Sequence, residues 1–247
     1  MKMYKLYQKN ALNFALIWIG IYCVVQSVAN GLSKMIGIPQ SANAVLALLQ
    51  SGFMLYWLRK NGLMRKFGLN KPDQSAKNML FYLPLILVST SNLWLGFRMN
   101  LTPAALFFHI LLMLSVGFLE ELIFRGFLFE ALRKDSLRSA VVISSLTFGA
   151  GHIVNLFNGR GMSFTDVIFQ ILFAILFGFL VVMIYLRSGS LIPCILSHQA
   201  INILSAFANR QGIQRNNLII NAIEAVIIVL YLWILSRTAP IREKKQD

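Results

Sequence analysis

Eight long apolar blocks divide this sequence, and each is close to the length that an α-helix needs to cross a lipid bilayer. A spanning helix takes roughly 17–25 apolar residues, because the hydrocarbon core is about 30 Å thick. The blocks therefore predict an all-α, polytopic membrane protein with about eight transmembrane helices. They occupy residues 11–28, 42–57, 79–95, 103–132, 139–157, 165–186, 190–208 and 217–236.

The composition agrees with a membrane domain. The chain is 57% hydrophobic and 13% charged, whereas a soluble domain is about 45–50% apolar and about 25% charged. We expect one membrane domain over residues 1–247 and no separate soluble domain. The fourth block is too long for the hydrocarbon alone, so its last turns should emerge into the interface or bend along it.

The formal net charge of +14 does not predict nucleic-acid binding. A basic groove gathers its charges on one soluble surface, but here they lie between apolar blocks, where they suit anionic lipid head groups and the positive-inside rule. With a cytoplasmic N-terminus and alternating spans, the inside segments hold seventeen lysines and arginines and the outside loops hold five, with Arg125 inside a span. This bias predicts that both termini are cytoplasmic.

The first block has a second interpretation, as a signal peptide. Three lysines precede it, and residues 27–29 resemble a small-residue cleavage site. We expect the span to be retained, because the charge bias then comes out well. The predicted location is the cell membrane, in multi-pass form.

Ionisable residues inside the blocks are the candidates for function, because a charge in hydrocarbon costs several kilocalories per mole. We expect His109 to be an interface residue near the outer end of its helix, and Glu224 to be structural or interfacial. The polar residues within spans are His109, Glu120, Glu121, Arg125, His152, His198, Asn202 and Glu224.

Helical geometry separates the two adjacent glutamates. Residues four apart differ by about 40° around the axis, so Glu121 shares a face with Arg125. Pairing these two would neutralise both charges and leave Glu120 pointing about 100° away, free for chemistry. Glu121 and Arg125 are therefore predicted to be structural support, and Glu120 to be reactive.

The depth of the residues in the membrane gives an independent test. Glu120 lies 13 residues before Arg133, His152 lies 14 after Arg138 and His198 lies 11 after Arg187. All three are therefore roughly 15–20 Å from the cytoplasmic ends of their helices. One site can form there, with Asn202 beside His198 and Phe148 as a wall next to His152.

This constellation has two chemical interpretations, and the residues alone leave both open. In one, Glu120 takes a proton from a water held by His152, while His198 and Asn202 donate hydrogen bonds to the oxyanion. In the other, His152, His198 and Glu120 hold a zinc ion whose bound water is the nucleophile. Both end in peptide hydrolysis. The alternative to any chemistry is that these side chains are polar glue between helices.

The same residues resemble a known family. Residues 120–125 read EExxxR, Phe148 to His152 read FxxxH, and His198 to Asn202 read HxxxN. This order is similar to that of the CAAX-type and bacteriocin-processing (Abi, or CPBP) intramembrane proteases. The resemblance implies a catalytic core at residues 103–208, a water-activating Glu120 helped by His152, and His198 and Asn202 as metal ligands or oxyanion stabilisers.

By resemblance, the substrate is a peptide or membrane-associated protein, and the short chain looks like the bacterial branch, which is linked to bacteriocin self-immunity. Other intramembrane proteases fit worse, because the sequence has no HExxH, no GxSxG and no pair of membrane-embedded aspartates. Two alternatives from other classes are a non-catalytic immunity or scaffold protein and a proton-coupled transporter. A transporter would be expected to show broken helices or repeated halves, and neither is evident in the sequence.

Overall fold

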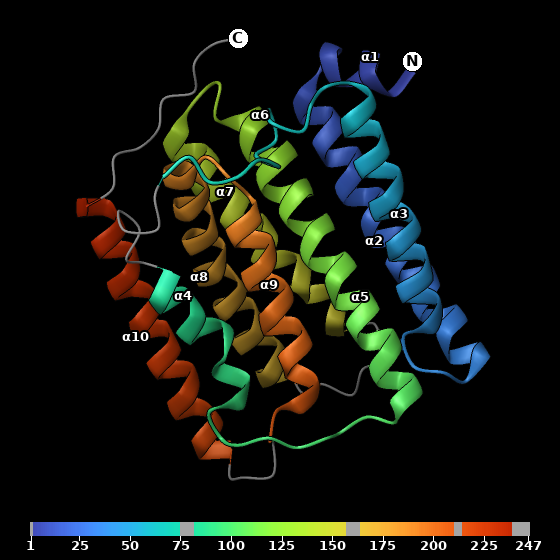
Figure 1. Ribbon diagram of the computed structural model, residues 1–247, viewed down its shortest axis with the longest axis vertical. Coiled ribbons are helices and arrows are strands. Elements are labelled where there is room, and N and C mark those ends of the chain that lie inside the picture. The colour runs from blue at the N-terminus through green and yellow to red at the C-terminus, as the bar shows by residue number, and fades with distance from the viewer. Residues whose placement is uncertain (1, 75–81, 157–163, 210–213, 239–247) are drawn as a thin grey trace.

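The computed structural model describes the chain except for residues 1, 75–81, 157–163, 210–213 and 239–247 (Figure 1). Apart from one antiparallel bridge between Phe97 and Ala208, the regular structure of the described part is helical. This confirms the predicted all-α class. The α-helices are α1 Lys2–Lys9, α2 Ala11–Ile36, α3 Ser41–Lys60, α4 Tyr82–Ser89, α5 Pro103–Glu121, α6 Glu130–Leu132, α7 Leu137–Ala150, α8 Phe164–Ser188, α9 Ile192–Leu204 and α10 Gln214–Thr238.

Each predicted apolar block overlaps at least one of these helices. Among the described residues, six helices are long and apolar enough to cross a membrane, and Ile192–Phe207 is a shorter apolar helix. The block at residues 79–95 forms only the short α4 and the 3-10 turn η1, Ser91–Leu93. At about 1.5 Å per residue, α4 as described covers less than half of the hydrocarbon thickness. The chain is thus a multi-pass membrane protein, and the start of its third apolar block lies outside the described residues.

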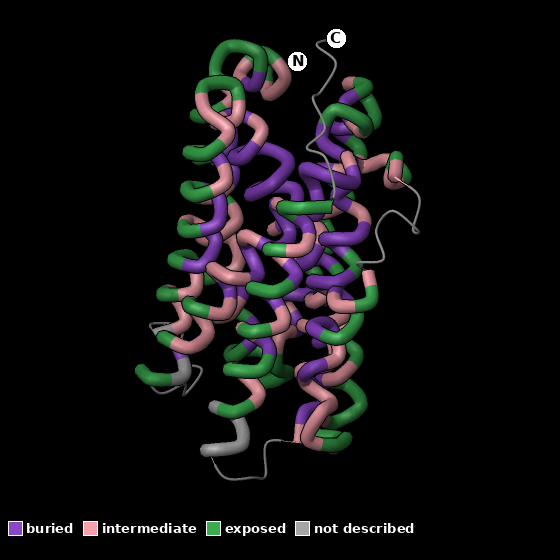
Figure 2. The backbone as a smooth tube through the Cα atoms, turned by 90° about the vertical axis from the view of Figure 1, so that its left-hand side faces the viewer, coloured by how far each residue is buried: buried purple, intermediate pink, exposed green. Residues whose placement is uncertain are grey.

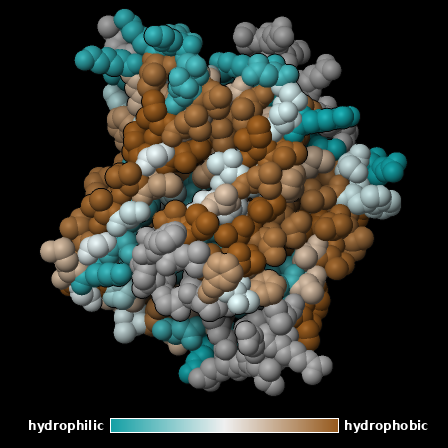
Figure 3. Space-filling view, turned by 180° about the vertical axis from the view of Figure 1, so that it is seen from behind, coloured by the Kyte–Doolittle hydropathy of each residue, from teal (hydrophilic) through white to brown (hydrophobic). Residues whose placement is uncertain are grey.

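The helices alternate in direction along the chain (Figure 1). The start of α2, the end of α3, the end of the fourth span and the end of α8 lie at one end of the molecule, together with the N-terminal helix α1. Seen from behind, a broad hydrophobic band crosses the middle of the surface, and hydrophilic residues gather at that same end (Figure 3). The predicted orientation, with this end in the cytoplasm, remains a prediction.

Local capping explains where several helices begin. Asn10 precedes α2 and its side chain accepts a hydrogen bond from the Asn13 backbone at 2.8 Å. Thr102 caps α5 just before Pro103, and Ser136 caps α7. Each polar side chain satisfies a backbone N–H that the first turn leaves without a partner.

The fourth span changes its helix type halfway. After α5, residues Leu122–Phe129 form a π-helix, η2, before the short α6. All eight η2 residues are buried, and buried backbone runs through the centre of the bundle (Figure 2). A π-helix is rare and often lies at a functional site, and the regular α-helical prediction for this block did not anticipate it.

Two contacts fix η2 and α5 in the bundle. Phe127 of η2 packs edge-on against Phe14 of α2, with ring centroids 5.0 Å apart. On α5, a Cβ added to Gly117 would lie 3.1 Å from the backbone nitrogen of Gln199 in α9. The missing side chain at Gly117 thus lets α5 and α9 approach closely, three residues before Glu120.

Candidate active site

Glu121 and Arg125 form the ion pair predicted from the sequence. Arg125 Nη1 lies 3.2 Å from Glu121 Oε1, and both side chains are fully buried. The guanidinium also lies over the ring of Phe148, 4.1 Å from its centroid. The pair therefore sits where α5 becomes η2 and leans on α7, which agrees with a role in holding the bundle together.

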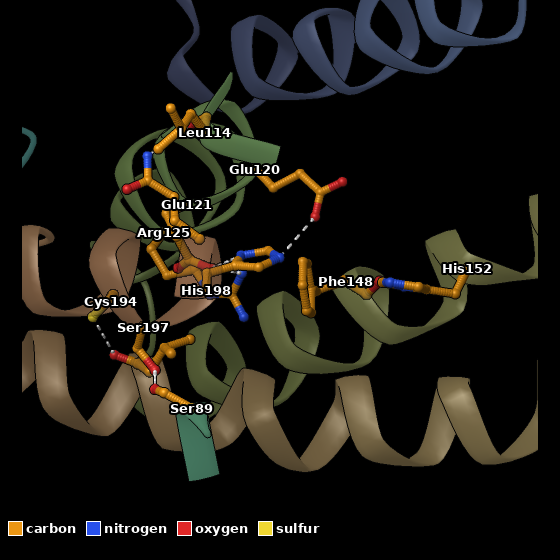
Figure 4. Close-up of polar contacts among 12 residues, drawn as sticks. Ser89, Leu114, Glu120, Glu121, Arg125, Phe148, His152, Cys194, Ser197 and His198 are labelled. Atoms are coloured by element: carbon orange, nitrogen blue, oxygen red, sulfur yellow. Dashed lines mark hydrogen bonds and ion pairs between the residues drawn. The ribbon is translucent and has the colours of Figure 1, made fainter. Parts of the chain in front are cut away.

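Glu121 has a second partner that helical spacing did not predict. His198 Nδ1 lies 2.8 Å from Glu121 Oε1, so one carboxylate oxygen joins Arg125 of its own span to His198 of α9 (Figure 4). An ionised carboxylate only accepts hydrogen bonds, so His198 Nδ1 is the donor. In the neutral imidazole this leaves Nε2 without a proton. Glu121 is therefore more than a structural neighbour, because it orients the imidazole of His198.

Glu120 points to the other side of His198, as the helix angle predicted. Its Oε2 lies 3.6 Å from His198 Nε2, and its side chain keeps 16% of its surface exposed, whereas Glu121 keeps none. The two neighbouring carboxylates thus differ in solvent access as well as in partners.

Tyr22 of α2 is a site residue that sequence reasoning missed. Its hydroxyl donates a hydrogen bond of 2.7 Å to Glu120 Oε1. A tyrosine in an apolar span looks like a packing or interface residue, so it did not stand out. The signal that could have found it was depth, since Tyr22 lies 13 residues after Lys9, just as Glu120 lies 13 before Arg133.

Two aromatic rings enclose His198. Phe148 of α7 and Phe177 of α8 present their rings edge-on to the imidazole, at centroid distances of 5.7 and 5.6 Å. The predicted contact of Phe148 with the site is therefore present. These apolar rings lower the local dielectric beside His198 and strengthen its interaction with Glu121.

His152 is not brought together with Glu120 and His198. It lies on the far side of Phe148 from His198, with its ring 5.4 Å from the Phe148 ring (Figure 4). The physical reason is that α7 ends at Ala150 and the chain continues as a 3-10 helix, η3 Gly151–Leu156. A 3-10 helix turns by about 120° and rises about 2 Å per residue, so His152 keeps its predicted contact with Phe148 but is not turned toward Glu120 and His198 as an α-helix would predict.

Asn202 follows His198 by one turn of α9, and its backbone is held firmly. His109 Nε2 lies 3.0 Å from the Asn202 carbonyl oxygen, and Ser205 donates to the same oxygen. Within the described part of the chain, no hydrogen bond joins its side-chain amide to Glu120, Glu121 or His198. Asn202 is therefore near the site in sequence and height, but it is not part of the hydrogen-bonded centre.

The structure also shows the surroundings of two ionisable residues that lie away from the candidate site, His109 and Glu224. His109 is buried inside the protein, because it is only 6% exposed and its Nδ1 lies 3.1 Å from Gln40 Oε1, and its place near the outer membrane interface stays a prediction. The turn before α3 folds over it. Glu224 is buried, and Ser91 is its hydrogen-bond partner, which agrees with a structural role.

The predicted zinc ligands do not form a set in this arrangement. Among the residues that the structure describes, no group of three His, Cys, Asp or Glu side chains is placed to hold a metal ion. The geometric cause is again Phe148, which separates His152 from His198 and Glu120. The donor residues as placed therefore do not fit a zinc ion.

Comparison with known proteins gives one match. Residues 102–204 match the family described as type II CAAX prenyl endopeptidase Rce1-like. Neither the curated proteins nor the solved structures include a match to this chain. The matched segment contains all three motifs and leaves α1, α2 and α3 outside. Residues 102–204, which carry the three motifs, are therefore similar to the Rce1-like CAAX endopeptidase family.

Proposed function

We propose that this protein is an intramembrane endopeptidase in which Glu120 and His198 activate a water molecule. The observation that carries the proposal is the arrangement of Glu120 Oε2, 3.6 Å from His198 Nε2, on a carboxylate that is partly exposed. A charged group within a membrane-spanning helix is costly. Polar glue between helices normally uses neutral side chains, so two carboxylates around one imidazole favour chemistry.

The path of the proton depends on the tautomer of His198. With Nδ1–H donated to Glu121, Nε2 is an acceptor, so a water near Glu120 can direct one hydrogen to Oε2 and the other to Nε2. Glu120 takes the first proton while the water oxygen forms a bond to the substrate carbonyl carbon. When the C–N bond breaks, the same proton passes from Glu120 to the leaving amine. Glu120 ends the cycle as a carboxylate.

Glu121 and Asn202 have supporting roles in this proposal. Glu121 fixes the ring of His198 and favours any positive charge that the ring gains, much as the buried aspartate does in a serine protease triad. Asn202, one turn further along α9, offers a side-chain N–H for the developing oxyanion. The role of holding water, which the sequence assigned to His152, is assigned here to His198.

The proposed substrates are peptides or membrane-associated proteins, since the site lies roughly 15–20 Å below the cytoplasmic ends of its helices. In a bacterial plasma membrane, two biological roles fit such an activity. One is bacteriocin self-immunity, and the other is the processing of peptides or of proteins similar to prenylated ones. The Rce1-like match supports the second role, and the wider family resemblance supports the first.

The test is hydrolysis by the purified protein in lipid nanodiscs. Candidate membrane-associated peptides, including lipidated ones, are incubated with wild type and with Glu120→Gln. We expect cleavage by wild type and none by the variant, because the amide keeps the shape but cannot take the proton. A matched control is Glu130→Gln, which alters a carboxylate paired with Arg133 outside the site and should leave turnover unchanged.

Each other outcome points elsewhere. Peptide binding without cleavage by wild type would favour the non-catalytic scaffold, and peptide-dependent proton movement in liposomes would favour the transporter. A zinc chelator such as phenanthroline is added in a parallel arm. We expect the rate to be unchanged, and a loss that zinc restores would overturn the metal-free mechanism.

A further inference from the structure

We propose that Tyr22 is a positioning residue that makes the two oxygens of the Glu120 carboxylate inequivalent. The inference rests on the proposed function. Tyr22 lies in α2, outside the segment that matches the protease family, and its hydroxyl donates to Glu120 Oε1 at 2.7 Å. The structure thus places a component of the site on a helix that the family match leaves out.

The geometry of the carboxylate gives Tyr22 a specific task. Oε1 accepts the phenolic hydrogen, while Oε2 faces His198 Nε2 at 3.6 Å. A hydrogen bond to a charged oxygen is short and strong, so the carboxylate plane is held with Oε2 toward the imidazole. A proton taken from water then goes to Oε2, the free oxygen. Oε2 is also the oxygen that shares its side of the site with His198, where the leaving amine must collect that proton.

The helix that carries Tyr22 is itself held in place. Phe14, Trp18 and Tyr22 follow one another at intervals of four residues, so they lie along one side of α2. Phe14 is fully buried and packs against Phe127 of η2, two residues after Arg125. The hydroxyl is therefore presented from a fixed support that contacts the same span as Glu120.

This placement joins the N-terminal helices to the chemistry. If α2 only anchored the protein in the membrane, none of its side chains would need to reach a carboxylate of the fourth span. The contact instead makes α2 a part of the catalytic unit, and it predicts that residues 102–204 alone would position Glu120 poorly.

The kinetic test compares two tyrosine-to-phenylalanine variants of the full chain in nanodiscs. Tyr22→Phe keeps the ring and removes only the hydroxyl, and we expect kcat to fall about tenfold to a hundredfold with KM within about twofold. The matched control is Tyr56→Phe, on an exposed position of α3 next to Lys60, which should leave both constants unchanged. A wild-type kcat in Tyr22→Phe, an equal loss in Tyr56→Phe, or a rise in KM alone would overturn the proposal.

A spectroscopic test separates this inference from the proposed function. The infrared difference between wild type and Glu120→Gln isolates the carboxylate bands of Glu120. We expect Tyr22→Phe to shift those bands, because they respond to the hydrogen bond at Oε1, and Tyr56→Phe to leave them in place. A shift in a protein that cleaves no tested peptide would uphold the Tyr22 contact while the hydrolase proposal fails. Unshifted bands would overturn the Tyr22 proposal even if hydrolysis is observed.

Discussion

Two buried histidines join α5 to α9, one at each end of their contact, and only one of them has the features of a catalytic group. His198 and His109 are almost equally buried, at 5% and 6% exposure. His198 lies between Glu121 and Glu120, whereas the ring nitrogens of His109 meet an amide oxygen of Gln40 and the backbone carbonyl of Asn202. Burial of a histidine is therefore uninformative by itself, and its carboxylate partners make the difference.

The region around His109, called the outer region below, shows that the presence of a cavity does not identify an active site either. His109 borders a cavity of about 300 Å³ whose lining includes Gln40, Asn100 and Ser205. The lining holds no carboxylate, its amides and hydroxyls are weak bases, and both ring nitrogens of its one imidazole, His109, already face Gln40 and Asn202. The inner region, around His198, has Glu120, a carboxylate that is partly exposed.

The strongest test of the difference between the two regions is to make the same substitution at the histidine of each. We expect His198→Gln to lower kcat by about a hundredfold to ten-thousandfold, because the water loses its second acceptor and Glu121 loses the group that it orients. His109→Gln should stay within about threefold of wild type. Turnover of a cleaved peptide in nanodiscs is the measurement. An equal fall in kcat for the two histidine variants would mean that His198 has no specific catalytic role.

The next effect concerns the ion pair beneath His198. Arg125→Ala leaves Glu121 as an unpaired carboxylate in a fully buried position, and the loss of one partner of a buried pair typically costs about 3–5 kcal/mol. We expect the free energy of unfolding in detergent to fall by about that amount. Glu121→Gln with Arg125→Met removes both charges and should recover much of the stability.

The double variant also sharpens the division between the two glutamates. Because Glu121 orients His198, the stable double variant should still hydrolyse slowly, and activity per folded molecule measures this. If Arg125→Ala were as stable as wild type yet inactive, Arg125 would act in the chemistry. The assignment of Arg125 to structural support would then be wrong.

A smaller effect is expected where α5 and α9 touch between the two regions. Gly117→Val places a side chain against the Gln199 backbone, where even a Cβ would lie 3.1 Å from the nitrogen, and overpacking typically costs about 1–3 kcal/mol. Gly20→Val is the matched control, since nothing lies within 4 Å of a Cβ added there. Thermal unfolding of both variants checks this. A Gly117 variant as stable as the Gly20 variant would show that the helices separate without cost.

The smallest effect is on stability in the outer region. His109→Gln keeps one polar group for Asn202 or Gln40 but not both, so we expect a loss of about 1 kcal/mol in the free energy of unfolding. His109→Leu removes the contacts with both Gln40 and Asn202, although Ser205 still donates to the Asn202 oxygen, and it should lose more, roughly 1–3 kcal/mol. If the leucine variant were the more stable of the two, the hydrogen bonds of His109 would not hold the helices together.

The features that could be predicted from the sequence are those determined within a single helix. The apolar blocks, the pairing of Glu121 with Arg125 and the separate direction of Glu120 all follow from length and from the i, i+4 rule. The position of His152 did not follow, because the change from α7 to η3 leaves no periodic signal among apolar residues. The contact of Tyr22 with Glu120 and that of Gln40 with His109 join distant segments. Spacing along the chain gives the depth of a residue in the membrane but not its partner on another helix.

The π-helix η2 has a consequence for how this protein tolerates change. A helix that faces lipid on one side accepts replacement at every third or fourth position, because those side chains touch only acyl chains. Residues 122–129 are all buried, so we expect no periodic pattern of tolerated replacements over these eight consecutive codons. A library of single replacements, selected for correctly inserted protein, should tolerate almost no replacement at residues 122–129. In α2 and α10 it should show tolerated positions at intervals of three or four residues. The centre of the molecule would then be visible in genetic data before any activity is known.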